Sequence, residues 1–198
     1  MNITRLLQRL ASALSLVCVS AAFAAAPAMP SPLPDDPTCT PDDRKFMTRA
    51  FELARFAMAR GDGAIGAVLV SKDGKILAEF GNMVTTESDV TLHGETGLIS
   101  YASRVLPKAA WEGSTLYTSL EPCVMCCGSI RWAGIATVVY GGSSRQPTGA
   151  PWGPERLRAR EVYQRTNAAV KVRGPLMDDE QIKLRGEQAR RVAVVAKP

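Results

Sequence analysis

The sequence predicts an α/β layered domain with a mixed sheet, on three observations. Short β-branched runs alternate with amphipathic stretches, the order that places helices on the faces of a sheet. The first two strand-like runs flank an Asp-Gly pair, so the sheet begins with an antiparallel hairpin. The chain has 198 residues, of which 46% are hydrophobic, and this is sufficient for one well-buried core.

The first helix is predicted to begin at Pro41. Thr40 is a suitable N-cap, proline is favoured in the first turn, and two acids follow at the positive end of the helix. Apolar residues recur at three- and four-residue spacing from Phe46 to Met58, and A-R-G-D-G ends the run. The runs A-I-G-A-V-L-V-S and K-I-L-A-E-F then form the hairpin around Lys72-Asp73-Gly74.

The remaining elements alternate between helix and strand. Helices are predicted over residues 95–106 and 123–133, with strands in S-T-L-Y-T-S-L and I-A-T-V-V-Y-G-G. A last strand lies in A-A-V-K-V-R-G-P, and a closing helix covers residues 178–192. That helix has acids at its start and arginines at its end, which suits the helix dipole.

Residues 1–24 have the order of an export signal. Arg5 and Arg9 come first, an apolar run follows over residues 10–23, and small residues near Ala24 offer a cleavage site. The run is short for a membrane span, so we expect release without an anchor and a periplasmic or secreted protein. The alternative is a buried N-terminal helix. Residues 25–40 hold five prolines and are predicted to be an extended, solvated linker, which leaves 41–198 as the folded domain.

The charge distribution does not favour a nucleic-acid partner. The formal net charge is +5, and the basic excess lies late in the chain. Residues 154–198 hold eleven Lys or Arg and six Asp or Glu. Scattered charges of both signs are more typical of a solvated helix face than of a nucleic-acid footprint.

The stretch S-L-E-P-C-V-M-C-C-G-S-I places three cysteines within five residues. They cannot all bridge to the distant Cys39, so a disulfide framework fits poorly, and metal ligation or thiol redox chemistry remains. Cys123 and Cys126 are three residues apart at a predicted helix start, so their sulfurs lie on one side. The free amides there favour thiolates, the form that binds metal.

The single histidine of the chain, His93, is followed two residues later by Glu95. A lone histidine is usually a structural residue. Together with Cys123 and Cys126, however, it makes three zinc ligands, the number typical of a catalytic site that keeps a position for water. Glu95 is then the candidate proton carrier. The pattern H-x-E followed by P-C-x-x-C is the signature of zinc nucleobase deaminases.

Three other interpretations compete with a catalytic zinc site. A thioredoxin-like Cys-x-x-Cys also begins a helix, but it has no use for the distant His-x-Glu. A structural zinc site needs a fourth protein ligand, and Cys127 points about 100° round the helix from Cys126. The third interpretation is that these residues occur together by chance.

Residues 42 to 142 resemble the cytidine deaminase-like superfamily, in the branch of the cytosine, guanine and tRNA adenosine deaminases. G-A-I-G-A-V-L-V is similar to the first strand of that family, and G-N-M-V-T-T-E-S-D-V-T-L-H-G-E to its substrate loop and zinc histidine. T-L-Y-T-S-L-E-P-C-V-M-C-C-G-S-I is similar to its strand and cysteine helix. The resemblance implies a three-layer α/β/α fold with a five-stranded mixed sheet. It also implies a Zn²⁺ cofactor held by His93, Cys123 and Cys126, with Glu95 moving protons.

The same resemblance implies two substrate contacts. Asn82 stands where a family asparagine binds the base, although a turn residue after Gly81 is the alternative. Trp132 resembles a tryptophan of guanine deaminases, with a core aromatic as the alternative. H-G-E is similar to the corresponding motif of cytosine deaminases, and N-M-V-T-T-E-S-D-V-T is similar to that of guanine deaminases. Residues 64–65 are Ala-Ile, whereas guanine deaminases usually have Pro-Phe there.

We therefore expect a zinc-dependent hydrolytic deaminase of a free nucleobase, of the cytosine or guanine type, or of a nucleoside. Its partner is a small molecule, and the resemblance implies a homodimer. One alternative is an adenosine deaminase of tRNA or single-stranded nucleic acid, which export argues against. Another is a silent zinc- or nucleobase-binding module, which Glu95 argues against. Cys39 and Cys127 are the only pair left for a disulfide.

Overall fold

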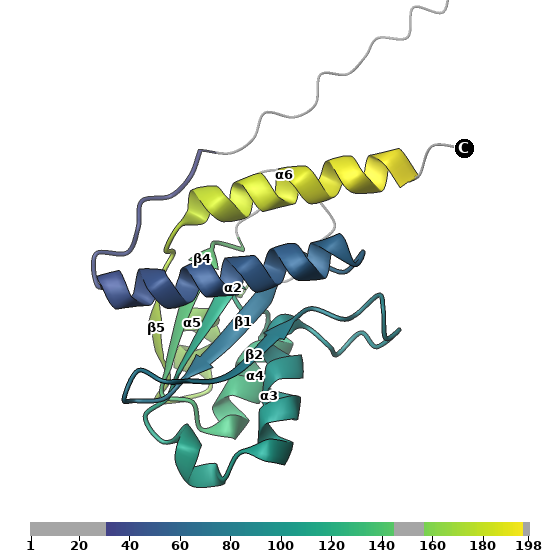
Figure 1. Ribbon diagram of the computed structural model, residues 1–198. Helices are drawn as coiled ribbons and strands as arrows, with labels where there is room; N and C mark the ends of the chain where they lie inside the picture. Colours follow the sequence, from purple (N-terminus) through teal and green to yellow (C-terminus); the bar gives the residue numbers. More distant parts are fainter. Residues whose placement is uncertain (1–30, 145–156, 196–198) are drawn as a thin grey trace, which may run out of the picture.

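The computed structural model describes residues 31–144 and 157–195, which form a five-stranded sheet between two helix layers (Figure 1). The strands are β1 (Gly66–Val70), β2 (Ile76–Gly81), β3 (Thr115–Leu120), β4 (Thr137–Gly142) and β5 (Lys171–Arg173). Their order across the sheet is β2-β1-β3-β4-β5. β1 is antiparallel to β2 and β3, whereas β3, β4 and β5 are parallel. The predicted three-layer α/β/α class with a mixed sheet is confirmed.

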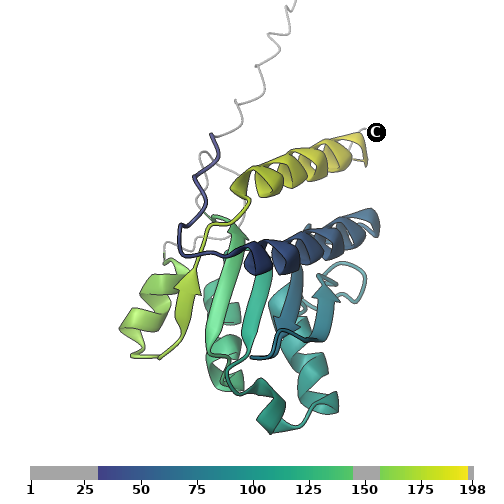
Figure 2. The same cartoon turned by 60° about the vertical axis from the view of Figure 1, so that its left-hand side comes forward.

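The helices divide between the two faces of the sheet. One face is covered by α2 (Pro41–Ala59) and α6 (Asp178–Val195), and the other by α3 (Gly94–Val105), α4 (Val124–Ala133) and α5 (Ala159–Arg165) (Figures 1 and 2). A short 3-10 helix, Lys108–Trp111, precedes β3. Among the described residues, none of the helices is long and apolar enough to cross a bilayer.

The start of α2 is fixed by a capping box. The backbone N–H of Asp43 donates to the Thr40 hydroxyl at 3.2 Å, and the backbone N–H of Thr40 donates to the Asp43 carboxylate at 2.7 Å. The buried carboxylate of Asp43 also accepts from Tyr117 at 2.7 Å and from Arg173 at 2.9 Å. Burial alone raises the pKa of Asp43, but these hydrogen bonds outweigh it and lower that pKa. One acid thus joins α2 to β3 and β5.

A glycine lets α2 lie directly on the sheet. A Cβ atom at Gly66, the first residue of β1, would lie 2.3 Å from the carbonyl oxygen of Ala50 on α2. Only a residue without a side chain allows this approach.

Two buried clusters lie on opposite faces of the sheet. The cluster under α2 and α6 includes Phe46 and Met47, and Cys39 packs against it. The cluster under α3, α4 and α5 includes Leu98 and Cys127. The sequence left open whether Cys39 and Cys127 form a disulfide. A disulfide requires Cα atoms within about 7 Å, but the sheet separates these two residues, and all four cysteines of the described residues are free.

The sequence pattern did not predict α5. Its seven residues are preceded by Arg158 at the N-cap, which is not one of the usual capping residue types. Only Ala159, Val162 and Tyr163 are buried along it, too few to produce a helical period. The predicted boundaries of α3 and α6 differ from the observed ones by one to three residues, which is ordinary for helix ends.

Residues 31–40 contain no helix or strand, as predicted, but they are tied to the domain. The backbone N–H of Asp36 donates to the carbonyl of Pro175 at 2.8 Å, and its carboxylate accepts from the backbone of Gly174 at 2.9 Å. The backbone N–H of Leu33 donates to Asp178 at 2.8 Å. This part of the predicted linker is therefore an anchored extension. The predicted signal segment lies outside the described residues.

Candidate metal centre

Two helix starts bring the three predicted ligands together at the end of β3. His93 is the N-cap residue of α3, and Cys123 is the N-cap residue of α4. Neither side chain caps its own helix. Cys126 lies in the first turn of α4, as predicted, whereas Cys123 lies one position before that turn and not within it.

The donor atoms of these residues form a compact cluster. The two sulfurs of Cys123 and Cys126 lie 3.4 Å apart. Nδ1 of His93 lies 3.7 Å from the sulfur of Cys123 and 3.6 Å from that of Cys126. Among the described residues, these three form the group of side chains that could hold a metal ion.

The spacing of the donors fits zinc. A tetrahedral zinc ion, with bonds of about 2.3 Å to sulfur and about 2.0 Å to nitrogen, separates two sulfurs by about 3.8 Å and sulfur from nitrogen by about 3.5 Å. The observed distances of 3.4, 3.6 and 3.7 Å lie within about 0.4 Å of these values. Two thiols and one imidazole are also the donor types that zinc prefers.

The two thiols are hydrogen-bonded to each other. Chiefly through this contact, the pKa of Cys123 falls to about 4. The same hydrogen bond, together with burial, raises the pKa of Cys126. One thiolate is thus available at neutral pH, and a divalent ion that binds both sulfurs displaces the proton of the other thiol.

Glu95 lies beside the donor cluster in the first turn of α3. The residue is 2% exposed, and its Oε2 accepts from the sulfur of Cys126 at 3.5 Å. Burial, and then the negative charge of Cys123, raise the pKa of Glu95. A buried acid that holds its proton to higher pH than an exposed one is suited to proton transfer near neutral pH.

Thr118, which was not predicted from the sequence, contacts the other oxygen of that acid. Its hydroxyl donates to Glu95 Oε1 at 3.1 Å and also lies 3.1 Å from the carbonyl of Leu120. The available signal was strand alternation, since Thr118 faces the same side of β3 as Leu116, toward α3 and α4.

Glu121 was also missed, and it supports the approach to Pro122 and Cys123. Its buried carboxylate accepts from the backbone of Ser144 at 3.2 Å and of Ala159 at 3.1 Å, and pairs with Arg158 at 3.0 Å. It therefore holds the end of β4 and the start of α5 against the turn that leads into α4. A buried acid with several donors is a strong local constraint.

Asn82 lies buried directly after β2. Its Oδ1 accepts from the backbone N–H of Val84 at 3.1 Å, which supports the turn interpretation. Its backbone carbonyl accepts from Arg60 at 3.1 Å. No described residue hydrogen-bonds its Nδ2 group. The turn and a contact with substrate are therefore compatible, and the substrate role of Asn82 stays a prediction.

Trp132 and Cys127 occupy opposite environments on α4. Trp132 is 87% exposed, so the core alternative is wrong, and its substrate role stays a prediction. Cys127 is fully buried, and its sulfur lies 3.6 Å from the carbonyl of Pro122. It points away from the donor cluster, as the sequence predicted.

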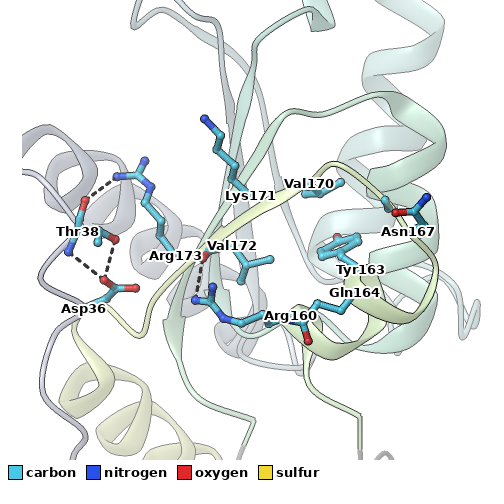
Figure 3. A pocket seen from close by; sticks show the side chains of 11 residues that line it. Asp36, Thr38, Arg160, Tyr163, Gln164, Asn167, Val170, Lys171, Val172 and Arg173 are labelled. Atoms are coloured by element: carbon cyan, nitrogen blue, oxygen red, sulfur yellow. Dashed lines mark hydrogen bonds between the residues drawn. The ribbon is translucent and has the colours of Figure 1, made fainter.

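A separate groove of about 620 Å³ lies along β5 and α5 (Figure 3). None of the predicted site residues lines it. Two of its cations already have partners, because Arg160 donates to the carbonyl of Val172 at 2.9 Å and Arg173 pairs with Asp43. The donor cluster, and not this groove, therefore carries the candidate chemistry.

Residues 40–142 match the family model of the cytidine and deoxycytidylate deaminase zinc-binding region. The chain belongs to this family. Zinc is accordingly its cofactor, and His93, Cys123 and Cys126 could form the zinc site. This family membership, together with the architecture, confirms the resemblance to the cytidine deaminase-like superfamily.

The curated relatives of this chain are named for different bases. The chain is 33% identical over 150 residues to a probable cytosine deaminase of Schizosaccharomyces pombe, covering 71% of this chain and 88% of that protein. It is 46% identical over 96 residues to the guanine deaminase of Bacillus subtilis, covering 48% of this chain and 61% of that protein. The second match thus spans less than two thirds of its relative.

Solved structures similar to this chain also differ in the substrates that their descriptions name. One from a study of A-to-I editing by tRNA:A34 deaminases is 32% identical with a TM-score of 0.58, covering 71% of this chain and 98% of that chain. Another, in complex with 2,6-diaminopurine, is 25% identical with a TM-score of 0.62, covering 75% and 82% of the two chains. These comparisons identify the deaminase family but do not identify the substrate.

Proposed function

We propose that this protein is a hydrolase that removes the exocyclic amine of a free nucleobase, of the cytosine or guanine type, and releases ammonia. One observation carries the proposal: the buried carboxylate of Glu95 lies 3.5 Å from the sulfur of a predicted zinc ligand, Cys126. An acid in that place is what proton transfer at a zinc site requires. Similarity to the cytosine and guanine deaminases supports a free base.

The roles of the residues follow from their positions. His93, Cys123 and Cys126 would hold zinc, which supplies a nucleophilic water at neutral pH. Glu95 takes one proton from the attacking water and gives it to the ring nitrogen, and it then moves the remaining proton of the new hydroxyl group to the leaving amine. The carbon–nitrogen bond breaks, ammonia leaves, and the oxygen of the water stays on the ring. The free Nδ2 group of Asn82 is available to hydrogen-bond an acceptor of the base.

The test is an ammonia-release screen on the zinc-loaded full chain. Its substrates are cytosine, guanine, adenine, their nucleosides, and a tRNA containing the target adenosine. We expect turnover of at least one free base, abolished by a chelator and restored by zinc. Release of ammonia from the tRNA alone would favour the nucleic-acid alternative, which the similarity to tRNA:A34 deaminases supports. Bound zinc with no turnover of any substrate would favour the silent module.

We also propose that the protein is a homodimer and is exported. Trp132 is 87% exposed on α4, and burial against a second copy would remove that apolar surface from water. Sedimentation of the wild type and of Trp132→Ser tests the dimer; a monomeric wild type would contradict it. N-terminal sequencing of the protein from the extracytoplasmic fraction tests export, with a new end near residue 25 expected.

A further inference from the structure

A hydroxyl group is buried in the central strand β3 beside the carboxylate of Glu95. Thr118 is 0% exposed, and its neighbours across the sheet are Ala67 on β1 and Tyr140 on β4. An apolar side chain would pack in this place without a polar group to satisfy. A buried hydroxyl costs free energy unless it is hydrogen-bonded, so its partners indicate what it does.

The hydroxyl has two acceptors within reach and one proton. Glu95 Oε1 and the carbonyl of Leu120 each lie 3.1 Å away. A hydrogen bond to a charged acceptor is stronger than one to a neutral carbonyl, so an ionised Glu95 is the preferred partner. Since a hydroxyl can also accept, the contact is available in either protonation state of the acid.

The carboxylate needs such a contact to hold one orientation. The last torsion of a glutamate is broad and roughly two-fold, so packing alone fixes it poorly. Glu95 also accepts a hydrogen bond from the sulfur of Cys126, at 3.5 Å. A sulfur that binds metal has lost its proton, so it no longer donates to the acid. Thr118 then remains as the side-chain donor to Glu95.

We propose that Thr118 is a positioning residue for Glu95: its hydroxyl holds Oε1 against β3, so that Oε2 faces the metal donors. The inference rests on the proposed function, because it assigns Thr118 to the proton-transfer step. Thr118 is not one of the three predicted zinc ligands and acts through Glu95.

The test compares two substitutions of Thr118 with a matched control. Thr118→Val keeps the branched shape and removes the hydroxyl, and Thr118→Ser keeps the hydroxyl. Ser114, just before β3, is also fully buried, and its hydroxyl has no partner among the described residues. Ser114→Ala therefore removes a buried hydroxyl from the same region without touching Glu95.

We expect Thr118→Val to lower kcat for cytosine or guanine by about 10- to 100-fold, the loss that corresponds to one hydrogen bond to a charged group. KM, zinc content and Tm should stay near those of the wild type. Thr118→Ser should recover most of kcat, and Ser114→Ala should keep all of it. An unchanged kcat in Thr118→Val, an equal loss in Thr118→Ser or in Ser114→Ala, or loss of zinc from Thr118→Val would each overturn the assignment.

A readout without turnover separates this inference from the proposed function. Crystal structures of the zinc-loaded wild type and of Thr118→Val should show one carboxylate orientation of Glu95 in the first and a rotated or multiple orientation in the second. The same single orientation in both would refute the positioning role. A wild type inactive on every substrate would refute the proposed function, and the two crystal structures would still decide whether Thr118 orients Glu95.

Discussion

Adjacent cysteines on α4 allow a direct test of the metal centre. Cys126 and Cys127 are both fully buried, but the first lies 3.4 Å from the sulfur of Cys123 and the second 3.6 Å from the carbonyl of Pro122. Serine at either position makes the same chemical change. We expect Cys126→Ser to lose zinc and Cys127→Ser to keep it.

The two substitutions should have different effects on zinc affinity and on stability. Loss of a residue that only supports a ligand weakens metal binding by about 10- to 100-fold, so loss of the Cys126 ligand itself should exceed about 100-fold. Zinc at 100 times its Kd stabilises the folded chain by about 2.7 kcal/mol, which is about 5–11 °C in Tm for a chain of this size. Cys126→Ser should lose that increment. Cys127→Ser should keep it and lose about 1–2 kcal/mol of stability with and without zinc, because a hydroxyl replaces a sulfur in an apolar cluster.

The assays are zinc content by mass spectrometry, competition with a coloured chelator, and thermal unfolding with and without zinc. One zinc per chain at wild-type affinity in Cys126→Ser would refute the reasoning. So would equal loss of zinc from Cys127→Ser.

Three further predictions concern buried acids. Glu95→Gln should keep zinc and Tm while kcat falls by about 10²- to 10⁴-fold, since the amide fills the same space but carries no proton between atoms; retained turnover would remove Glu95 from the mechanism. Glu121→Gln should lower the free energy of unfolding by about 2–3 kcal/mol, because Arg158 and two backbone donors lose a buried carboxylate; urea unfolding measures this, and an unchanged midpoint would contradict it. Because the pKa of Asp43 is lowered in the folded chain, Asp43 takes up a proton at higher pH when the chain is unfolded. The stability that Asp43 contributes is therefore present above about pH 4 and is lost as the pH falls through the folded pKa. Asp43→Asn should be less stable at pH 7 and should lack that part of the acid-induced decrease in Tm between pH 5 and 3; equal slopes would count against the role of Asp43.

The features that could be predicted from the sequence are those set by local spacing. Cys123 and Cys126 are three residues apart at a helix start, and His93 stands two residues before Glu95, so each pair fixes its own geometry once a helix begins there. The hairpin and the first helix likewise follow from turn and capping residues. These signals need no knowledge of distant contacts.

The missed features depend on distant contacts. Thr118 reads as an ordinary β-branched strand residue, and its hydrogen-bond partner lies 23 positions earlier in the chain. Glu121 reads as part of a loop, and its partners in α5 lie more than thirty positions later. The sequence left the Cys39–Cys127 pairing open for the same reason, since only the folded sheet shows that the two residues lie on opposite faces.

Both helices at the metal centre begin at residues whose side chains turn away from the usual capping role. Neither His93 nor Cys123 makes the side-chain capping hydrogen bond that an N-cap residue normally makes. A metal ion held by His93, Cys123 and Cys126 would therefore join the start of α3 to the start of α4. Amide hydrogens in these first turns should exchange with solvent much faster after zinc is stripped, while those of the Asp43-anchored helix on the other side of the sheet keep their protection.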